Sequence, residues 1–434
     1  MIVKAIFSFV YFLLKSLVRL YQPFYFPFTK VVNKEGLDFS GPAIIVSNHP
    51  NTLMDPFNVI SRTPRRVYPL ANSSIFKPPF VAAIFNQLAI PIFRPGQDDT
   101  KLKVDNNQSF SRAFEHLASG GAIYIAPEGG SYEGRRLNPI KTGTARISLG
   151  AENENDFNLG VQIIPVGVNY DHPNHCGNRL YIEVGQPILA KEWESDFLKD
   201  PKEANRKMTA EIERQMQALL IHTDDDEQDQ LLYRLQIILQ NEQPLDIQNN
   251  YNRTQQLLTG LKSLKKTDHK AYQKLVDAAT HYRQTIKEIG ISDEGISARK
   301  KALFTPFSIL GWPLWLYGRI NNFIAIEIPR WLVEKLDLYI GYTSTVKVLS
   351  SLFTFPISYF LQYKLVLFFT GQPIAWMYLL SLPISAVFCA WYMRYFRSRI
   401  GAYKWRKWAK KYPREAEDLV KERDGLICEV TNFA

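Results

Sequence analysis

The sequence predicts an α/β domain with a mostly parallel sheet flanked by helices, then a helical appendage and a membrane-associated helical hairpin. Three observations carry this prediction. Strand-like apolar runs alternate with amphipathic stretches in residues 31–195, polar stretches with helical spacing fill residues 196–300, and residues 301–411 are apolar and aromatic with a basic flank. A chain of 434 residues is long enough for several such modules.

The N-terminal segment, residues 1–30, is predicted to be an interfacial membrane helix. Its apolar run over residues 5–14 covers ten positions, which is about half the length that a span requires. Lysines and Arg19 flank this run, and aromatic residues crowd positions 21–28. Cationic flanks with an aromatic collar are typical of a helix that lies in the bilayer surface. The alternative is an ordinary amphipathic helix that packs on the next domain.

Six apolar runs are predicted to form the strands of the sheet: residues 42–46, 67–71, 89–93, 122–126, 162–168 and 180–184. Amphipathic stretches between them predict helices over residues 80–87, 102–117 and 142–151. Runs this apolar are typical of a sheet that is covered on both faces. Pro165 lies inside the fifth run, and because proline cannot donate to a strand ladder, it predicts an edge strand or a pocket wall.

The turn after the first predicted strand carries the strongest candidate for chemistry. Residues 47–56 read SNHPNTLMDP and place His49 and Asp55 six positions apart. A histidine can take a proton from an alcohol, and a carboxylate on its other ring nitrogen fixes the tautomer and stabilises the imidazolium. A histidine that caps a helix, followed by an aspartate in its first turn, is the alternative for this motif alone.

Two later turns offer groups that bind anions. Arg94 follows the third predicted strand, and a guanidinium there can bind a phosphate or carboxylate with two parallel hydrogen bonds. The next turn reads PEGGS and supplies four candidate residues, Glu128, Gly129, Gly130 and Ser131. Its glycines let backbone N–H groups approach an anion, and its carboxylate could hold Arg94 or Lys141. Open sheets place ligand sites at such turns, so we expect one site here.

Four blocks of sequence, NHPNTLMD, AIPIFR, APEGGS and IIPVG, follow one another between about residues 40 and 190. In this order they resemble the glycerolipid acyltransferases, the family of glycerol-3-phosphate and 1-acylglycerol-3-phosphate acyltransferases. Two departures from the usual pattern, five residues rather than four between His49 and Asp55 and PEGGS in place of PEGTRS, resemble the branch that acylates glycerol 3-phosphate or dihydroxyacetone phosphate. The resemblance implies that residues 31–195 are an acyltransferase domain.

The resemblance also implies a reaction. A fatty acyl group would pass from acyl-CoA or acyl carrier protein to a hydroxyl of glycerol 3-phosphate or dihydroxyacetone phosphate in phospholipid biosynthesis. Acylation of 1-acylglycerol 3-phosphate to phosphatidic acid is the alternative. His49 would act as the general base and Asp55 would orient it, while Arg94, Lys141 and the PEGGS turn would bind the acceptor phosphate. Backbone N–H groups near the helix after Asn51 are candidate oxyanion donors. We expect no metal and no cofactor beyond the acyl thioester co-substrate.

The apolar C-terminal region is predicted to be an integral membrane hairpin. Residues 374–393 reach the roughly 20 residues of a span, and the TGQP turn before them predicts a hairpin with residues 349–369. Basic residues follow directly: Arg394, Arg397, Arg399, Lys404, Arg406, Lys407, Lys410 and Lys411. This asymmetry predicts that the tail, residues 412–434, and the catalytic domain lie on the cytoplasmic side. A buried helical pair in a soluble core is the alternative.

Charge and cysteine content narrow the functional classes. A formal charge of +10 favours an anionic partner, but the basic cluster adjoins an apolar span and no nucleic-acid motif accompanies it. We therefore expect membrane lipids, and not nucleic acid, as partners. The three cysteines are far apart in the sequence, which predicts a reducing compartment. A non-catalytic membrane lipid-binding protein would not require His49, Arg94 and PEGGS in the family's order, so we expect an enzyme.

Overall fold

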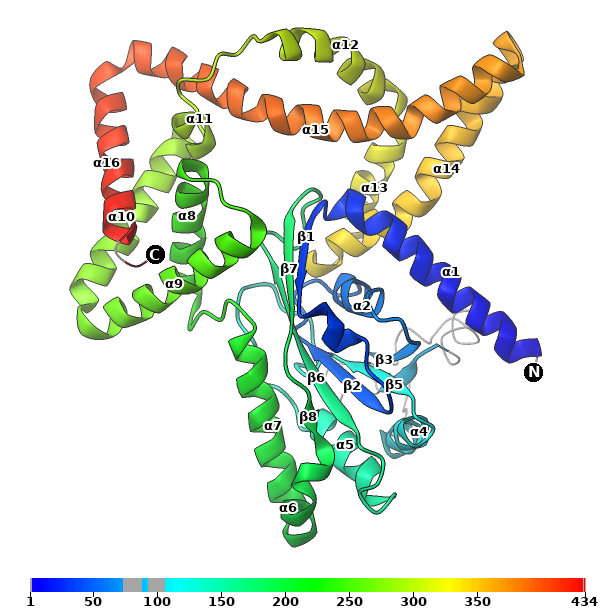
Figure 1. Ribbon diagram of the computed structural model, residues 1–434. Coiled ribbons are helices and arrows are strands. Elements are labelled where there is room, and N and C mark those ends of the chain that lie inside the picture. Colours follow the sequence, from blue (N-terminus) through cyan, green and yellow to red (C-terminus); the bar gives the residue numbers. More distant parts are fainter. Residues whose placement is uncertain (1, 73–87, 93–105, 432, 434) are drawn as a thin grey trace. The chain divides into compact units, whose positions relative to one another are not determined.

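The computed structural model describes residues 2–72, 88–92, 106–431 and 433, and the chain divides into two compact units. Met1–His222 and Ile340–Thr345 form the first unit, and Thr223–Tyr339 and Val346–Ala434 form the second (Figure 1). The helix predicted over residues 80–87 and the predicted site residue Arg94 lie outside the described residues.

The first unit is built on a mostly parallel sheet. Its described strands are β1 (Phe28–Val32), β2 (Ala43–Ser47), β3 (Val67–Asn72), β4 (Ile90–Ile92), β5 (Ala122–Ile125), β6 (Gln162–Tyr170), β7 (Arg179–Val184) and β8 (Ile188–Leu189). They run in the order β1-β7-β6-β2-β5-β3-β4, with β8 beside β6. All pairs are parallel except those of β6 with β7 and β8. The six predicted strands are confirmed, whereas the sequence analysis missed β1 and the very short β8.

Helices cover both faces of this sheet. They are α1 (Ile2–Tyr25), α2 (Met54–Ile60), α4 (Asn106–Ala118), α5 (Gly143–Asn153), α6 (Glu194–Lys199) and α7 (Pro201–Ala218), with short 3-10 turns η1 (Lys34–Leu37), η3 (Ala190–Trp193) and η4 (Ile340–Tyr342). Ile44 and Val46 of β2 share one buried cluster with α4, α5 and α7. Because side chains alternate along a strand, the buried Ile45 faces the other side of the sheet. Tyr124 of β5 also faces that side, where burial and then the charge of Asp55 on α2 raise its pKa.

The first unit extends to His222, beyond the domain boundary expected at residue 195. Met208, Ile212 and Met216 of α7 lie in the same buried cluster as β2 and β5. The sequence analysis assigned this helix to the appendage because its composition is polar. Its apolar stripe nevertheless covers the sheet, so α7 belongs to the α/β unit.

Pro165 lies in the middle of the sheet, so the edge-strand interpretation is wrong. Its strand, β6, has β2 on one side and β7 and β8 on the other. Gln162 donates its N–H toward the β2 side, and because N–H groups alternate along a strand, the nitrogen of Pro165 faces the opposite side. There β8 ends its pairing at Ile163 and β7 begins at Val166. The proline occupies the gap between two partner strands, where no ladder donor is needed.

Helix α1 turns Lys15 and Arg19 toward the domain. Lys15 Nζ donates to the carbonyls of Thr63 at 2.6 Å and Arg65 at 3.0 Å, and Arg19 Nε donates to Ser61 at 2.6 Å. These carbonyls follow the C-terminal end of α2, where the helix dipole favours positive charge. Large apolar residues point outward instead: Phe9, Phe12, Leu13, Leu14, Leu20 and Phe24. Lys15 and Arg19 thus make the contacts of the packing alternative, while the exposed apolar face leaves the interfacial helix a prediction.

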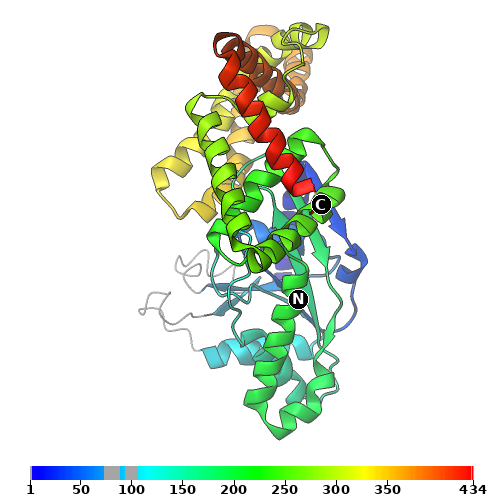
Figure 2. The same ribbon diagram turned by 90° about the vertical axis from the view of Figure 1, so that its left-hand side faces the viewer.

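The second unit is helical in its described residues. It contains α8 (Asp226–Glu242), α9 (Ile247–Thr267), α10 (His269–Glu288), α11 (Asp293–Ser297), α12 (Pro306–Asn321), α13 (Phe323–Leu336), most of α14 (Thr343–Thr370), α15 (Gln372–Lys411) and α16 (Pro413–Thr431). Helices α8, α10 and α16 pack together (Figure 2). The buried Arg423 of α16 donates to Asp293 at 2.8 Å and Glu242 at 2.7 Å. The predicted helical appendage is thus confirmed, and within it Asp268 ends α9 and caps the start of α10.

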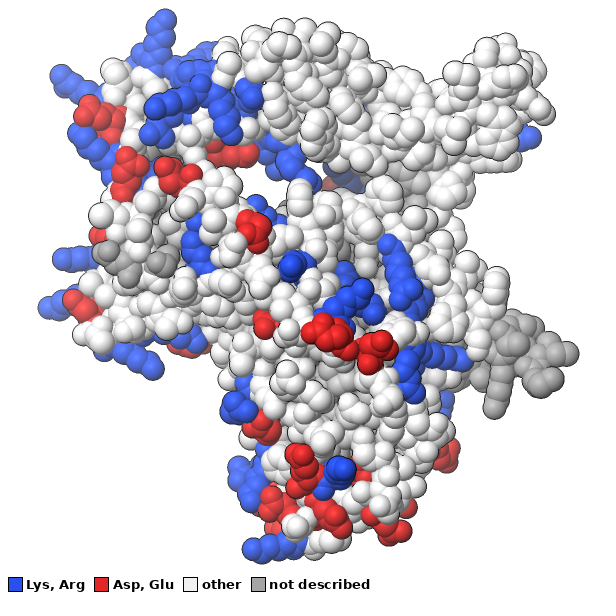
Figure 3. All heavy atoms as spheres, viewed as in Figure 1, with Lys and Arg blue, Asp and Glu red and all other residues white. Residues whose placement is uncertain are grey.

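Helices α14 and α15 are the two arms of the predicted hairpin. Only Gly371 separates them, with a positive φ of 85° that glycine adopts without strain. Both helices are long and apolar enough to cross a membrane, and only 6% and 22% of their apolar windows are buried. Figure 3 shows almost no charge over α14 and the adjoining half of α15, whereas Lys and Arg gather at the end of α15 that leads into α16.

Candidate active site

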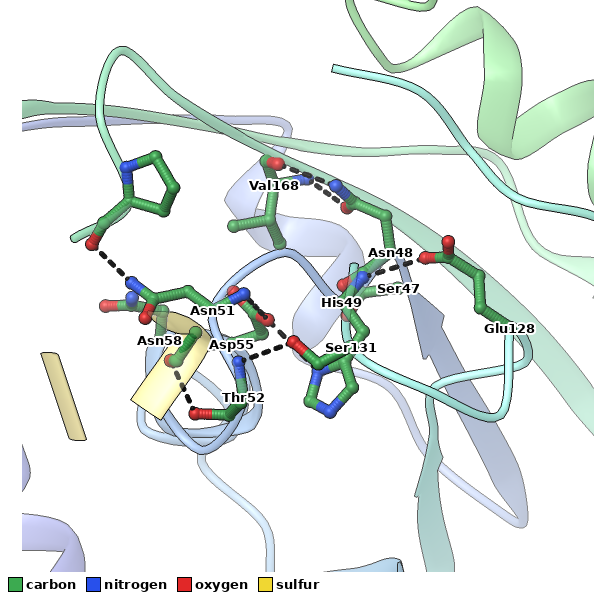
Figure 4. Close-up of polar contacts among 12 residues, drawn as sticks. Ser47, Asn48, His49, Asn51, Thr52, Asp55, Asn58, Glu128, Ser131 and Val168 are labelled. Carbon is green, nitrogen blue, oxygen red and sulfur yellow. Dashed lines mark hydrogen bonds and ion pairs between the residues drawn. The ribbon is translucent and has the colours of Figure 1, made fainter. Parts of the chain in front are cut away.

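The turn after β2 is anchored to β6 by an asparagine. Asn48 Nδ2 donates to the carbonyl of Val168 at 2.9 Å, and the N–H of Val168 donates to Asn48 Oδ1 at 2.8 Å (Figure 4). This side chain therefore continues the strand ladder after β2 has ended. Further along the turn, Asn51 Nδ2 donates to the carbonyl of Pro173 at 2.6 Å. The turn is held in place by the segments that border it.

The turn brings the predicted pair together. His49 Nδ1 lies 3.0 Å from Asp55 Oδ2, with the aspartate side chain fully buried and the histidine side chain 20% exposed. A carboxylate can only accept, so Nδ1 carries the proton and Nε2 is the basic nitrogen. The N–H of Asn51 donates to the same carboxylate oxygen at 2.7 Å. This is the geometry of a general base with its orienting group.

Tyr170, at the end of β6, is a third partner of Asp55 that the sequence analysis missed. Its hydroxyl donates to Asp55 Oδ1 at 2.8 Å and accepts from Asn58 Nδ2 at 2.9 Å. Burial raises the pKa of Tyr170 well above its ordinary value, and the nearby charge of Asp55 raises it further. The hydroxyl therefore keeps its proton and remains a donor. No motif marks this tyrosine, because its role depends on where β6 ends relative to α2.

Glu128 supports the turn that carries His49. One of its oxygens accepts from the N–H of His49 at 2.9 Å (Figure 4). The other accepts from the N–H and the side-chain amide of Asn138 at 3.0 and 2.8 Å. Burial raises the pKa of Glu128, against the lowering effect of these hydrogen bonds. The sequence analysis suggested that Glu128 could hold Arg94 or Lys141. In the structure its two oxygens accept from backbone N–H groups and a side-chain amide. Glu128 therefore joins the APEGGS block to the NHPNTLMD block.

The PEGGS turn and Lys141 lie beside the turn that carries His49 and Asp55. Gly129 has a φ of 71°, and a Cβ added there would come within 2.9 Å of Lys141 Nζ. The N–H of Lys141 donates to the carbonyl of Pro127 at 2.9 Å. Ser131 Oγ accepts from the N–H of Thr52 at 3.2 Å (Figure 4). The structure thus brings together the dyad, the PEGGS turn and Lys141, while Arg94 falls outside the described residues.

Five of the backbone N–H groups around Asn51, where oxyanion donors were expected, already donate within the protein. The N–H of His49 donates to Glu128, that of Asn51 to Asp55 and that of Thr52 to Ser131. The N–H groups of Met54 and Asp55 donate to carbonyls within the turn. These donors hold the turn in shape and are already used by the protein itself.

Comparison with known proteins finds similarity for part of the first unit. The family model for acyltransferases matches residues 28–169. We call this segment, which matches the acyltransferase family, the acyltransferase domain. The match contains the three turns and the β6 block on which the predicted resemblance rested, so that prediction is confirmed. His49, Asp55, Glu128, Lys141 and Tyr170 all lie within it or directly at its end.

The curated relatives are similar to the acyltransferase domain over short stretches. Glycerol-3-phosphate O-acyltransferase 2 of Saccharomyces cerevisiae is 37% identical over 111 residues, which are 25% of this chain and 15% of the relative. Glycerol-3-phosphate O-acyltransferase 1 of the same yeast is 42% identical over 86 residues, or 20% and 11% of the two chains. The matches therefore span less than a sixth of the length of these relatives.

One solved structure is also similar. It is the 1-acyl-sn-glycerophosphate acyltransferase of Thermotoga maritima, with 17% identity, a TM-score of 0.34, and coverage of 48% of this chain and 81% of that one. A TM-score of this size does not by itself identify a shared fold. The acyltransferase assignment rests on the family model and the yeast relatives.

We expect Tyr170→Phe to lower kcat for acyl transfer by about tenfold or more while KM changes little, because a hydrogen bond to a charged group contributes roughly 1.5–3 kcal/mol. The change removes only the hydroxyl that holds Asp55. Tyr181→Phe is the control, since Tyr181 is a buried tyrosine of the same sheet that donates to Glu183. Equal kinetics for Tyr170→Phe and wild type would remove Tyr170 from the site.

Proposed function

We propose that the acyltransferase domain transfers a fatty acyl group from an acyl thioester, acyl-CoA or acyl carrier protein, to a hydroxyl of glycerol 3-phosphate. The observation that carries this proposal is the His49–Asp55 pair at 3.0 Å, with the PEGGS turn and Lys141 beside it. The similarity to two yeast glycerol-3-phosphate O-acyltransferases supports the same acceptor. Dihydroxyacetone phosphate and 1-acylglycerol 3-phosphate are the alternative acceptors, since they carry the same phosphate.

The reaction needs no covalent acyl-enzyme. Nε2 of His49 takes the proton from the acceptor hydroxyl as its oxygen attacks the thioester carbonyl. The C–S bond then breaks, and the leaving thiolate receives the proton from the imidazolium. Asp55 keeps the ring in the required tautomer and stabilises the imidazolium, as its contact with Nδ1 allows.

The PEGGS turn and Lys141 are suited to bind the acceptor phosphate. Lys141 lies against Gly129, and glycines in this turn let backbone and ligand approach closely. We place the phosphate near this lysine, with Arg94 as a second cation from the block that precedes it. This arrangement would hold the glycerol hydroxyl toward His49.

Membrane attachment follows from the apolar surfaces. We propose that α14 and α15 span the bilayer, since their apolar windows are mostly exposed. The outward apolar residues of α1 would lie in the bilayer surface, although its cations face the domain. The basic end of α15 then favours a cytoplasmic side for the tail and the acyltransferase domain. The acylated product and the fatty acyl donor partition into lipid, so an enzyme that acts on them suits such a location.

The dyad provides the first test of the function. We expect His49→Ala and Asp55→Asn to remain folded and to lose about a hundredfold or more in kcat, because general-base catalysis contributes that much. The double variant should be little worse than either single one, since the two groups act as a unit. Labelled acyl-CoA with a panel of acceptors measures both activity and acceptor choice. Full activity in His49→Ala would overturn the dyad mechanism, whereas wild-type protein that acylates no acceptor would leave the non-catalytic lipid-binding protein as the better alternative.

Phosphate recognition provides the second test. We expect Lys141→Ala and Arg94→Ala each to raise KM for glycerol 3-phosphate by about tenfold, since a charge-assisted hydrogen bond contributes roughly 1.5–3 kcal/mol. KM for the acyl thioester should change much less. A neutral monoacylglycerol serves as the control acceptor, and an equal loss with both acceptors would show that these cations act on stability alone.

The membrane provides the third test. High salt screens surface charges but leaves apolar insertion intact. We therefore expect the protein to stay with membranes through a high-salt wash and to be released by detergent. Recovery in the salt supernatant would contradict the spanning hairpin and would favour attachment through the basic end of α15.

A further inference from the structure

We propose that Thr52 is a positioning residue for the His49–Asp55 pair, and that a segment almost 300 residues later, Ile340–Thr345, holds it in place. This segment belongs to the first unit, although the chain before and after it belongs to the second. It also begins the first candidate membrane span. The inference rests on the proposed function, because the chemistry that Thr52 supports is that of the dyad.

Two buried contacts join Thr52 to this segment. Its hydroxyl donates to the carbonyl of Gly341 at 3.0 Å and lies 2.8 Å from the hydroxyl of Thr345. A hydroxyl has a single proton, so Thr345 is the donor in the second contact. Both threonine side chains are 4% exposed. Water cannot readily replace these partners, so a lost hydroxyl leaves a buried polar group unsatisfied.

The backbone of Thr52 requires such support. Its φ of 37° lies in the left-handed region, which a β-branched residue rarely adopts. A strained residue persists only where its surroundings hold it, and such residues gather at functional sites. The N–H of Thr52 donates to Ser131 and its carbonyl accepts from the N–H of Asp55 at 3.3 Å. Thr52 thus joins the PEGGS turn to the residue that orients His49.

A second connection runs parallel to the first. Ser344 Oγ donates to the carbonyl of Pro173 at 2.7 Å, and that carbonyl also accepts from Asn51 Nδ2. Tyr25, at the end of α1, donates to Ser344 at 2.8 Å. Asn51 in turn donates its N–H to Asp55. The Ile340–Thr345 segment therefore contacts Thr52 directly and shares a carbonyl acceptor with Asn51, and both of these turn residues contact Asp55.

These contacts assign the Ile340–Thr345 segment a part in catalysis that an anchor alone would not have. If the segment were released, Thr52 could relax to an ordinary conformation and the carboxylate of Asp55 would lose its alignment with Nδ1. The effect would fall on turnover, since the hydroxyls of Thr52 and Thr345 are engaged within the protein. The first membrane span and the catalytic turn would then be coupled through the six residues at its start.

The test uses the full chain in detergent or membranes. Thr52→Val and Thr345→Val remove one hydroxyl each and keep the shape, and Thr52→Ser restores the hydroxyl. We expect Thr52→Val to lower kcat by about tenfold, the effect of one unsatisfied buried group, with both KM values within about twofold. Thr345→Val should lower kcat less, the double variant should be no worse than Thr52→Val, and Thr52→Ser should recover most of the loss.

Hydrogen exchange supplies a readout that does not depend on acyl transfer. The amides of residues 47–56 should exchange faster in both valine variants, and Thr52→Ser should return them toward the wild-type rate. Thr209→Val is the matched control, because the buried Thr209 hydroxyl donates to a carbonyl within α7. It should change neither kcat nor exchange in the turn.

The outcomes separate the two proposals. Wild-type protein that acylates no acceptor, with faster exchange in Thr345→Val, would overturn the proposed function and leave the positioning contact in place. An active wild type with unchanged kcat and unchanged exchange in Thr345→Val would overturn the inference. A loss of melting temperature in Thr52→Val that serine does not repair, without a change in exchange at the turn, would also count against it.

Discussion

The site depends on a carboxylate in a fully buried position, that of Asp55. Burying such a group without partners costs several kcal/mol, and here three donors surround it: His49 Nδ1, the N–H of Asn51 and the hydroxyl of Tyr170. The donors come from the turn itself and from the end of β6. The strand order that places β6 beside β2 is therefore what allows this carboxylate to remain buried and aligned with the histidine.

Much of the fold and the centre of the site could be predicted because their signals are local. Apolar runs marked six strands, and the spacing of His49 and Asp55 placed both on one turn. The supporting residues could not be predicted in this way. Tyr170 and Thr345 lie 115 and 293 positions from their partners in the turn, and nothing near them in the sequence distinguishes a supporting hydroxyl from any other.

The differences between expectation and structure have a common physical cause. Pro165, the polar helix α7 and the cations of α1 were each interpreted from composition, whereas their places are set by partners. A proline is tolerated in a central strand where the neighbouring strand changes, and a polar helix covers a sheet if one stripe is apolar. Lys15 is buried because its ammonium donates to two carbonyls that follow the end of α2, those of Thr63 and Arg65.

Polar side chains of α1 connect this apolar surface helix to the site. Gln22 of α1 donates to Asn58 at 2.6 Å, Asn58 donates to Tyr170, and Tyr170 donates to Asp55. Each donor in this chain polarises the next, which strengthens the last hydrogen bond to the carboxylate. Lys15 and Arg19 hold the C-terminal end of α2 while this chain holds its start. A helix whose outer face is apolar is thereby joined to the predicted catalytic pair through a few hydrogen bonds, and it stabilises the conformation of that pair.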